Sequence, residues 1–162
     1  MIGDVHGQGD TALMRLALEE AQVAVEAGDV PVGAVAVLAG AVVGRQHNRK
    51  EDLVDPTAHA ELLLLREVAS RLGRWRLPDV TVYCTMEPCP MCAWAMHLAG
   101  IRRLVLGLRH AALKRTDMGT YSVERFVEMT GCSYELSTGV REAECLALRQ
   151  RWGKDQTGRP RG

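Results

Sequence analysis

Residues 57–92, TAHAELLLLREVASRLGRWRLPDVTVYCTMEPCPMC, carry the clearest indication of how this chain folds. Apolar residues recur at helical spacing over 58–72, and Gly73 follows them as a helix end. The run 80–85 is rich in apolar and β-branched residues, which predicts a strand. Pro90 suits the first turn of another helix, because proline lacks only an amide that is unpaired there in any case. The stretch therefore predicts a helix, a strand and a second helix, in that order.

The alternation of helices and strands continues on both sides of this stretch. The sequence pattern predicts, in chain order, a helix at 10–27, strands at 32–38 and 41–46, the helix at 90–98, a strand at 104–108, an exposed loop at 109–118, a helix at 122–129, a strand at 133–136 and a last helix at 141–152. Such alternation indicates an α/β fold in which helices cover both faces of one sheet. We expect one domain over residues 1–152 and a flexible tail over 153–162, which lacks an apolar anchor.

The composition narrows the class of protein. The 162 residues match the size of one domain, and 20 basic residues balance 20 acidic ones, so the overall field does not attract nucleic acid. With 47% hydrophobic and 25% charged residues, the composition excludes a disordered chain and a coiled coil. The longest apolar stretch, 31–44, is interrupted by glycine and is shorter than the roughly 20 residues that span a bilayer. Acids near the N-terminus argue against a secretory signal, so we expect a cytoplasmic protein with no membrane partner.

The cysteines indicate metal or thiol chemistry. Their odd number, without an export signal, argues against a disulfide framework; they are Cys84, Cys89, Cys92, Cys132 and Cys145. Cys89 and Cys92 are three positions apart at a predicted helix start, so both sulfurs can reach one ion. His59 can supply a third ligand from the start of the helix at 58–72. Two thiolates and an imidazole match the preference of Zn²⁺, and three protein ligands leave a fourth position open for water.

Two other interpretations of the Cys89 and Cys92 pair remain open at this point. The pair follows a predicted strand at a helix start, as a thioredoxin-like redox pair does. A structural zinc site would need a fourth ligand, for which the candidates are Cys84, His97, Cys132 and Cys145. None of these four has a paired spacing, and a lone cysteine is usually a small buried hydrophobic residue. The pair by itself therefore does not separate redox, structural and catalytic roles.

The pair becomes specific when it is combined with the segment around His59. The sequence reads His59-Ala60-Glu61 and, about thirty residues later, Pro88-Cys89-Pro90-Met91-Cys92. This two-part pattern resembles the signature of zinc-dependent nucleobase deaminases. Over residues 30–108 the chain resembles the cytidine and deoxycytidylate deaminase superfamily, and within it the branch of bacterial tRNA adenosine deaminases and guanine deaminases. Further matching segments are Pro31-Val32-Gly33-Ala34, Asn48-Arg49, Asp55-Pro56-Thr57-Ala58, Trp75-Arg76-Leu77, Glu87 and Ala93.

The resemblance implies a fold and a set of site residues. The fold is a three-layer α/β/α sandwich with a mixed five-stranded sheet, and the protein is usually a homodimer. In such enzymes the asparagine that matches Asn48 binds the substrate base or sugar. The backbone around Val32, Gly33 and Ala60 lines the pocket. Separately from the resemblance, the aromatic residues that could stack on a base are Tyr121, Trp94 and Trp152.

The chemistry expected of His59, Cys89 and Cys92 is hydrolytic deamination. A zinc ion lowers the pKa of its bound water toward about 7, so that a nucleophile is available at neutral pH. Glu61 is not needed as a ligand, and it can take a proton from the water and return it to the ring nitrogen and then to the leaving amine. Ammonia is the expected product.

The chain departs from the tRNA enzymes after the strand at 104–108. His110 stands where those enzymes have an acidic residue, and a different loop follows it to residue 122. This loop and the balanced net charge favour a free base or nucleoside as the substrate. Adenosine in a tRNA anticodon loop is the alternative substrate, which basic residues could hold: Arg102, Arg103, Arg109, Lys114, Arg115, Arg149, Arg151 and Lys154.

Overall fold

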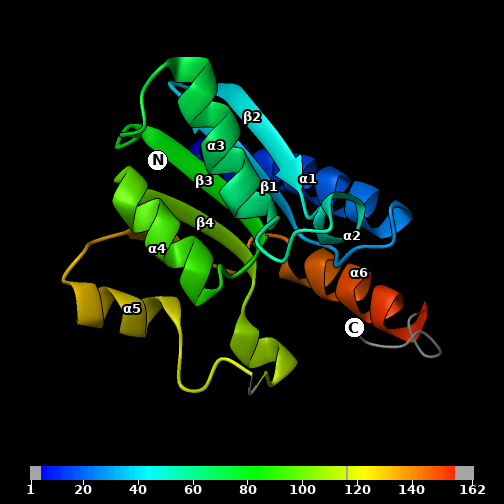
Figure 1. The fold of residues 1–162 in the computed structure, drawn as a ribbon. Coiled ribbons are helices and arrows are strands. Elements are labelled where there is room, and N and C mark those ends of the chain that lie inside the picture. The colour runs from blue at the N-terminus through cyan, green and yellow to red at the C-terminus, as the bar shows by residue number, and fades with distance from the viewer. Residues whose placement is uncertain (1–4, 116, 156–162) are drawn as a thin grey trace.

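The computed structural model describes residues 5–115 and 117–155, in which one five-stranded sheet lies between layers of helices (Figure 1). The strands are β1 (Gly33–Leu38), β2 (Ala41–His47), β3 (Val80–Met86), β4 (Arg103–Leu108) and β5 (Glu135–Ser137). The helices are α1 (Val5–Glu26), α2 (Lys50–Leu53), α3 (Ala60–Leu72), α4 (Pro90–Ala99), α5 (Val123–Thr130) and α6 (Glu142–Asp155), with a 3₁₀ turn, η1, at His110–Leu113.

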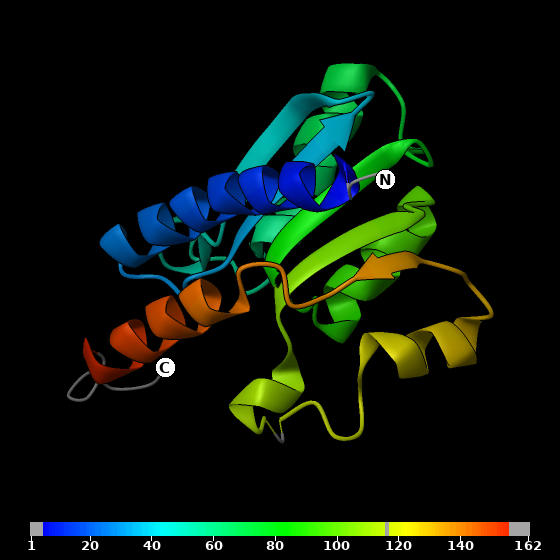
Figure 2. The ribbon, with the colours of Figure 1, turned by 180° about the vertical axis from the view of Figure 1, so that it is seen from behind.

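The sheet is mixed, and its strand order is β2-β1-β3-β4-β5. Strand β1 runs antiparallel to both β2 and β3, whereas β4 runs parallel to β3 and β5 runs parallel to β4. Helices α3 and α4 cover one face (Figure 1), and α1 and α6 cover the other (Figure 2). This arrangement confirms the expected α/β sandwich with a mixed five-stranded sheet.

Side chains on the strands alternate between two apolar cores. In β1, Ala34 and Ala36 belong to the core beneath α3 and α4, whereas Val35 and Val37 pack with α1. The period of two follows from the pleat, which turns successive side chains to opposite faces. Strands with both faces buried read as continuous apolar runs, and for this reason the sequence identifies them clearly.

Gly33 at the start of β1 allows α1 to pack directly on the sheet. A Cβ atom at this position would lie 1.9 Å from the carbonyl oxygen of Ala17 and 2.6 Å from the amide nitrogen of Ala21. Both are backbone atoms of α1, so a side chain here would push the helix away. Gly33 therefore has a packing reason that is separate from any contact with a substrate.

The first helix is longer than predicted, because Asp10 does not begin it. Helix α1 starts at Val5, and the Asp10 carboxylate is buried beneath it. That carboxylate accepts hydrogen bonds of 2.8 Å from the Tyr83 hydroxyl and 2.8 Å from the Arg103 guanidinium. Both partners lie on neighbouring strands, so sequence spacing alone does not reveal them.

The segments after β4 differ most from the prediction. Part of the expected exposed loop at 109–118 forms η1, with His110 buried, and residue 116 lies outside the described residues. Strand β5 occupies 135–137 rather than 133–136, and α6 continues past residue 152 to Asp155. The rest of the predicted tail, 156–162, also lies outside the described residues. Within the described part of the chain, no helix has the length and apolarity required to cross a membrane.

Candidate active site

The N-termini of helices α3 and α4 bring the predicted metal ligands together. His59 and Cys89 occupy the N-cap positions of the two helices, both with extended backbone, and Cys92 lies in the first turn of α4. Pro90 stands at the first position of α4, as its sequence context predicts. The exposed amides of a helix N-terminus favour negative charge, which suits thiolate ligands.

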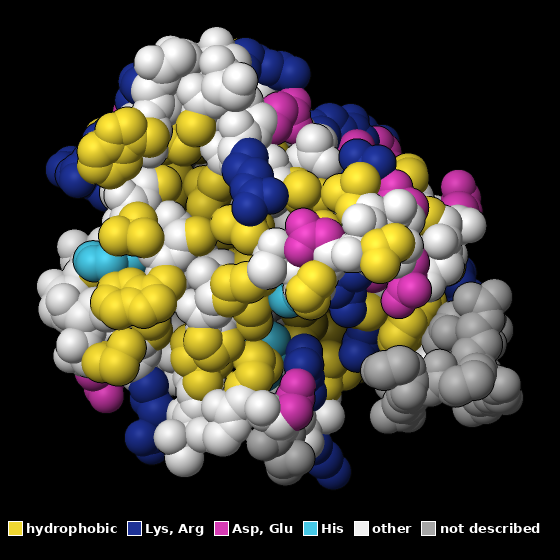
Figure 3. Space-filling view, viewed as in Figure 1, with side chains coloured by type: hydrophobic (Ala, Val, Ile, Leu, Met, Phe, Trp, Pro, Cys, Tyr) yellow, Lys and Arg dark blue, Asp and Glu magenta, His cyan; other side chains and the backbone are white. Residues whose placement is uncertain are grey.

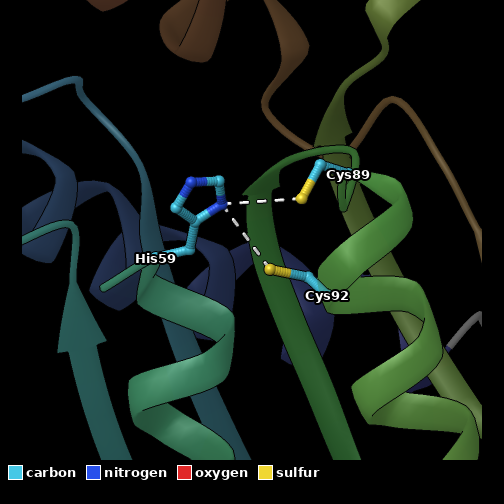
Figure 4. A group of neighbouring side chains, drawn as sticks. All are labelled: His59, Cys89 and Cys92. Atoms are coloured by element: carbon cyan, nitrogen blue, oxygen red, sulfur yellow. Dashed lines mark hydrogen bonds between the residues drawn. The ribbon is translucent and has the colours of Figure 1, made fainter. Parts of the chain in front are cut away.

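The three ligand atoms have the spacing that tetrahedral zinc requires. His59 Nδ1 lies 3.6 Å from Cys89 Sγ and 3.6 Å from Cys92 Sγ (Figure 4). Zn–N bonds of about 2.0 Å and Zn–S bonds of about 2.3 Å, set at a tetrahedral angle, place nitrogen and sulfur roughly 3.6 Å apart. The donor set and these two distances therefore fit Zn²⁺.

The thiols are electrostatically prepared for a cation. Hydrogen bonds from Cys92 and His59 lower the pKa of Cys89 to about 4, against the opposing effect of burial. The same bond to Cys89, together with burial, raises the pKa of Cys92. A coordinated metal ion deprotonates a thiol outright, so both cysteines can serve as thiolate ligands once the ion is bound.

The other cysteines and His97 lie outside this cluster. Among the residues that the structure describes, the group able to hold a metal consists of His59, Cys89 and Cys92. Cys132 accepts a hydrogen bond from Thr130, and His97 packs against the Trp94 ring. The described residues therefore form no structural zinc site with a fourth cysteine or histidine ligand, and two of the three ligands, His59 and Cys89, line the pocket.

Glu61 lies beside the ligands but does not belong to them. It is in the first turn of α3, is 3% exposed, and its Oε2 lies 3.8 Å from Cys92 Sγ. Burial raises the pKa of Glu61 to about 7. A carboxyl group whose pKa is close to neutral can both take up and release a proton at physiological pH.

Asn48 is held in place by the backbone around it. Its side-chain Oδ1 accepts a hydrogen bond of 2.8 Å from the backbone amide of Ala60. The backbone amide of Asn48 donates a hydrogen bond of 3.1 Å to the carbonyl oxygen of Val32. Because Oδ1 is engaged, the NH₂ group of Asn48 is the part that remains for a ligand. The contact with a substrate that the resemblance implies for Asn48 stays a prediction, and the structure shows that Asn48 is bonded to Ala60 and Val32.

A pocket opens next to the three ligands and Glu61. Its lining residues are Val30, Val32, Asn48, Lys50, His59, Glu61, Met86, Glu87, Cys89, His110, Arg115 and Arg149. The predicted residues Gly33, Ala60 and Tyr121 are not part of this lining. Tyr121 lies behind it, where its hydroxyl donates a 2.7 Å hydrogen bond to the Pro88 carbonyl. Trp94 is 49% exposed on α4 and packs edge-on against Phe126, away from the pocket.

Glu87 joins the pocket to the segment after β4, although the sequence identifies it only as part of a matching segment. Its buried carboxylate accepts hydrogen bonds from the Arg109 guanidinium at 3.0 and 3.2 Å, and from the amides of His110 and Val123 at 2.9 Å each. These bonds tie the segment after β4 to the wall of the pocket. Arg109 is therefore an internal partner of Glu87 rather than a free member of a basic surface.

His110 is buried in the pocket wall, although the sequence predicts it in an exposed loop. It is 6% exposed, and neither ring nitrogen has a hydrogen-bond partner among the described residues. Burial lowers the pKa of His110, which favours the neutral imidazole. A neutral imidazole offers one donor and one acceptor, and both ring nitrogens of His110 are buried.

These features define a zinc-dependent hydrolase site: three metal ligands, an open coordination position, and a buried carboxylate beside a pocket. The family model of the cytidine and deoxycytidylate deaminase zinc-binding region matches residues 8–108. The chain belongs to this deaminase family, and its cofactor is Zn²⁺.

Known relatives extend the comparison. The chain is 40% identical over 138 residues to the tRNA-specific adenosine deaminase of Bacillus subtilis (strain 168), covering 84% of this chain and 83% of the relative. A structure solved in a study of A-to-I editing by tRNA:A34 deaminases superposes with a TM-score of 0.76 at 40% identity, covering 85% and 99% of the two chains. The guanine deaminase of Bacillus subtilis superposes with a TM-score of 0.62 at 26% identity, covering 93% and 96%. Both kinds of enzyme share the fold, and the sequence is more similar to the tRNA deaminases.

Proposed function

We propose that this protein converts adenosine to inosine in a tRNA. The sequence alone favours a free base or nucleoside, because the net charge is zero and the loop after β4 is altered. Two facts favour tRNA adenosine instead. The relatives at 40% identity, which span most of this chain, are named as tRNA adenosine deaminases, whereas the guanine deaminase stands at 26%. Arg109 of the altered loop has an internal structural task, so the sequence of that loop says less about the substrate than it first suggests.

The observation that carries the reaction type is the position of Glu61. The carboxylate lies within 3.8 Å of one metal ligand, is buried, and lines the same pocket as His59 and Cys89. When bound at these ligands, the zinc ion supplies the Lewis acidity that makes a water molecule nucleophilic at neutral pH. A proton acceptor at the position of Glu61 is what the attacking water then requires.

Glu61 moves the protons of the reaction. Its carboxylate accepts a proton from the attacking water and delivers it to the ring nitrogen beside the amino-bearing carbon. The water oxygen bonds to that carbon. Glu61 then takes the second proton of the former water molecule and passes it to the amine as the carbon–nitrogen bond breaks. Adenosine and water thus give inosine and ammonia, with no change of oxidation state. Burial raises the pKa of Glu61, which helps the carboxyl to hold the proton that it has accepted as a base until it acts as an acid.

Asn48 orients the substrate in this proposal. Its side-chain NH₂ group is directed by the bond between Oδ1 and the Ala60 amide, so it can donate to an acceptor on the base or sugar without first reorganising. A preorganised donor costs little to align when the substrate binds. His59 and Asn48 line the same pocket, so binding and reaction occur in one cavity.

The test compares substrates on the zinc-loaded protein. The protein is incubated separately with four compounds: a tRNA transcript that has adenosine as the first anticodon nucleotide, free adenosine, guanine and cytidine. Inosine and ammonia are then measured. We expect inosine in the tRNA and negligible product from the free compounds. Glu61→Ala should lower the rate by a factor of about 10² to 10⁴ while the protein keeps its zinc. Glu128→Ala, at an exposed acid on α5, is the matched control and should change neither.

Two outcomes would contradict the proposal. Ammonia from guanine or a free nucleoside, with none from the tRNA, would restore the small-molecule substrate as the main interpretation. An active Glu61→Ala protein would remove the carboxylate from the proton transfer.

A further inference from the structure

Three basic side chains from separate parts of the chain line the pocket. Lys50 begins α2, Arg115 follows η1, and Arg149 lies in α6. Figure 3 shows histidine side chains at the base of this hollow and basic side chains along its rim. Neither the motif nor the metal chemistry requires any cation at these positions.

One of these three cations, Arg115, is paired with an acid, and the structure describes no ion pair of the other two. Glu87 is fully engaged by Arg109 and two backbone amides, and Glu61 stands beside the metal ligands. Asp117 pairs with Arg115 at the surface. Among the residues that the structure describes, neither Lys50 nor Arg149 forms an ion pair. The rim of the pocket therefore carries the positive charges of Lys50 and Arg149, which no ion pair of the described residues compensates.

Arg149 is the least expected of the three cations. Arg149 is half-buried and lines the pocket. Its guanidinium group lies 4.9 Å from the centre of the Trp152 ring. Burial and the nearby positive charge of Arg115 lower the pKa of Arg149. Asp117 is the partner of Arg115, and its charge only partly opposes the effect on Arg149. A half-buried cation without an ion pair of its own is unfavourable unless an anion binds it. Unpaired arginines elsewhere, such as Arg102 and Arg125, are fully exposed and carry no such cost.

We propose that Arg149 and Arg115, assisted by Lys50, form a phosphate-binding subsite at the rim of the pocket. The group that enters the pocket is then a nucleotide, whose base reaches the zinc ligands and Glu61 while its phosphate lies against the two guanidinium groups. Guanidinium groups suit this task because they donate to phosphate oxygens in a bidentate manner. The inference rests on the proposed deamination for the base, but the subsite itself is defined by charge and position alone.

The same phosphate can come from two sources. It can be a phosphodiester that flanks the target nucleotide in RNA, or the terminal phosphate of a free nucleoside monophosphate. Adenosine 5′-monophosphate, adenosine and a short anticodon stem-loop RNA separate these sources, since only adenosine lacks a phosphate. In each case a free base or nucleoside leaves the subsite empty, so it should be the poorer substrate.

The kinetic test uses Arg149→Gln, Arg115→Gln and the control Arg125→Gln. For the RNA, the monophosphate or both, kcat/KM should fall about tenfold to a hundredfold in each pocket variant, as expected when a charge-assisted hydrogen bond is lost. Every value of Arg125→Gln should stay within about twofold of the wild type, and turnover of adenosine, which has no phosphate, should not differ between the variants. Arg149→Lys, which keeps the charge, should recover part of the loss, and this recovery shows that the effect is not a folding defect. A fall for RNA alone identifies a phosphodiester, and a fall for the monophosphate alone identifies a free nucleotide.

A binding measurement separates this inference from the proposed reaction. Inorganic phosphate is titrated into the zinc-loaded protein by calorimetry, which requires neither a base nor turnover. Binding to the wild type that is lost in Arg149→Gln supports the subsite even if no adenosine compound is deaminated. Phosphate binding equal in wild type, Arg149→Gln and Arg125→Gln, or kinetic losses no larger than those of Arg125→Gln, would overturn it.

Discussion

The two sides of the active-site pocket come from parts of the chain with different relations to sequence. The region from β1 to α4 supplies the three metal ligands, Glu61 and Asn48. Each of these residues can be identified from a sequence motif. The region after β4 supplies His110, Arg115 and Arg149, and no motif predicts them. The first side holds the residues of the deamination reaction, and the second contributes part of the pocket wall.

This difference has a chemical reason. Zinc coordination tolerates few ligand types and few spacings, so the residues that provide it stand out in any sequence that contains them. A pocket wall can be built by many side chains of suitable shape and charge, and so it leaves no fixed spacing. Substrate preference within one deaminase fold is therefore expected to depend on the second region.

The largest effect should follow from a change on the metal side. Cys89→Ser removes one thiolate from a site that has only three protein ligands, so bound zinc should fall well below one ion per chain and deamination should fall to background. Elemental analysis and an ammonia assay measure the two quantities. Cys132→Ser, which alters a cysteine outside the cluster, should keep both. A Cys89→Ser protein with full zinc content would show that the cluster does not hold the ion, and the redox interpretation of the pair would return.

An intermediate effect should follow where the two sides are joined, at Glu87. Glu87→Gln leaves Arg109 and two amides without their charged acceptor, and should lower the free energy of unfolding at pH 7 by about 3 kcal/mol in urea denaturation. Burial acts to raise the pKa of Glu87, but hydrogen bonds from Arg109 and the two amides outweigh it, so the pKa is lowered.

The sign of this shift predicts a pH dependence. A carboxyl whose pKa is lower in the folded state stabilises the fold above its unfolded pKa of about 4.3, and loses that contribution as the pH falls through the folded pKa. The stability difference between wild type and Glu87→Gln should therefore be largest above about pH 5 and should shrink in acid. Glu128→Gln, at an exposed acid, should show no comparable difference. A Glu87→Gln deficit that persists unchanged at low pH would indicate lost packing instead of a lost charge.

The smallest effect should follow from His110, on the wall that the sequence does not reveal. His110→Ala removes a buried ring from the pocket wall, so kcat/KM should fall about tenfold, and the melting temperature should fall as well because the truncation leaves a cavity. Kinetics and thermal melting on the same preparation separate an effect on the reaction from an effect on stability. His97→Ala, at a histidine outside the pocket, is the control. A lower melting temperature with unchanged kcat/KM would make His110 a packing residue, and the second region would then matter less for the substrate than we infer.

Much of the fold was predictable because strands buried on both faces carry continuous apolar runs. Apart from the short helix α2, which was not predicted, the elements from β1 to β4 lie within two residues of their predicted ends. The errors fall where long-range contacts override local pattern. Asp10 is an example, since its partners Tyr83 and Arg103 lie on the sheet and not in its own helix.

The sequence by itself determined the reaction class, because His59, Glu61, Cys89 and Cys92 can be recognised from residue type and spacing. Only the tertiary structure decided which other side chains share the cavity with them. Arg109, predicted as part of a basic surface, turns inward to Glu87, whereas Arg149 from the last helix reaches the pocket rim. A metal site is assembled from two adjoining helix N-termini, so its ligands keep a local pattern. A pocket wall is formed by segments that come into contact only after the sheet has formed. Their spacing in the sequence therefore does not predict that contact.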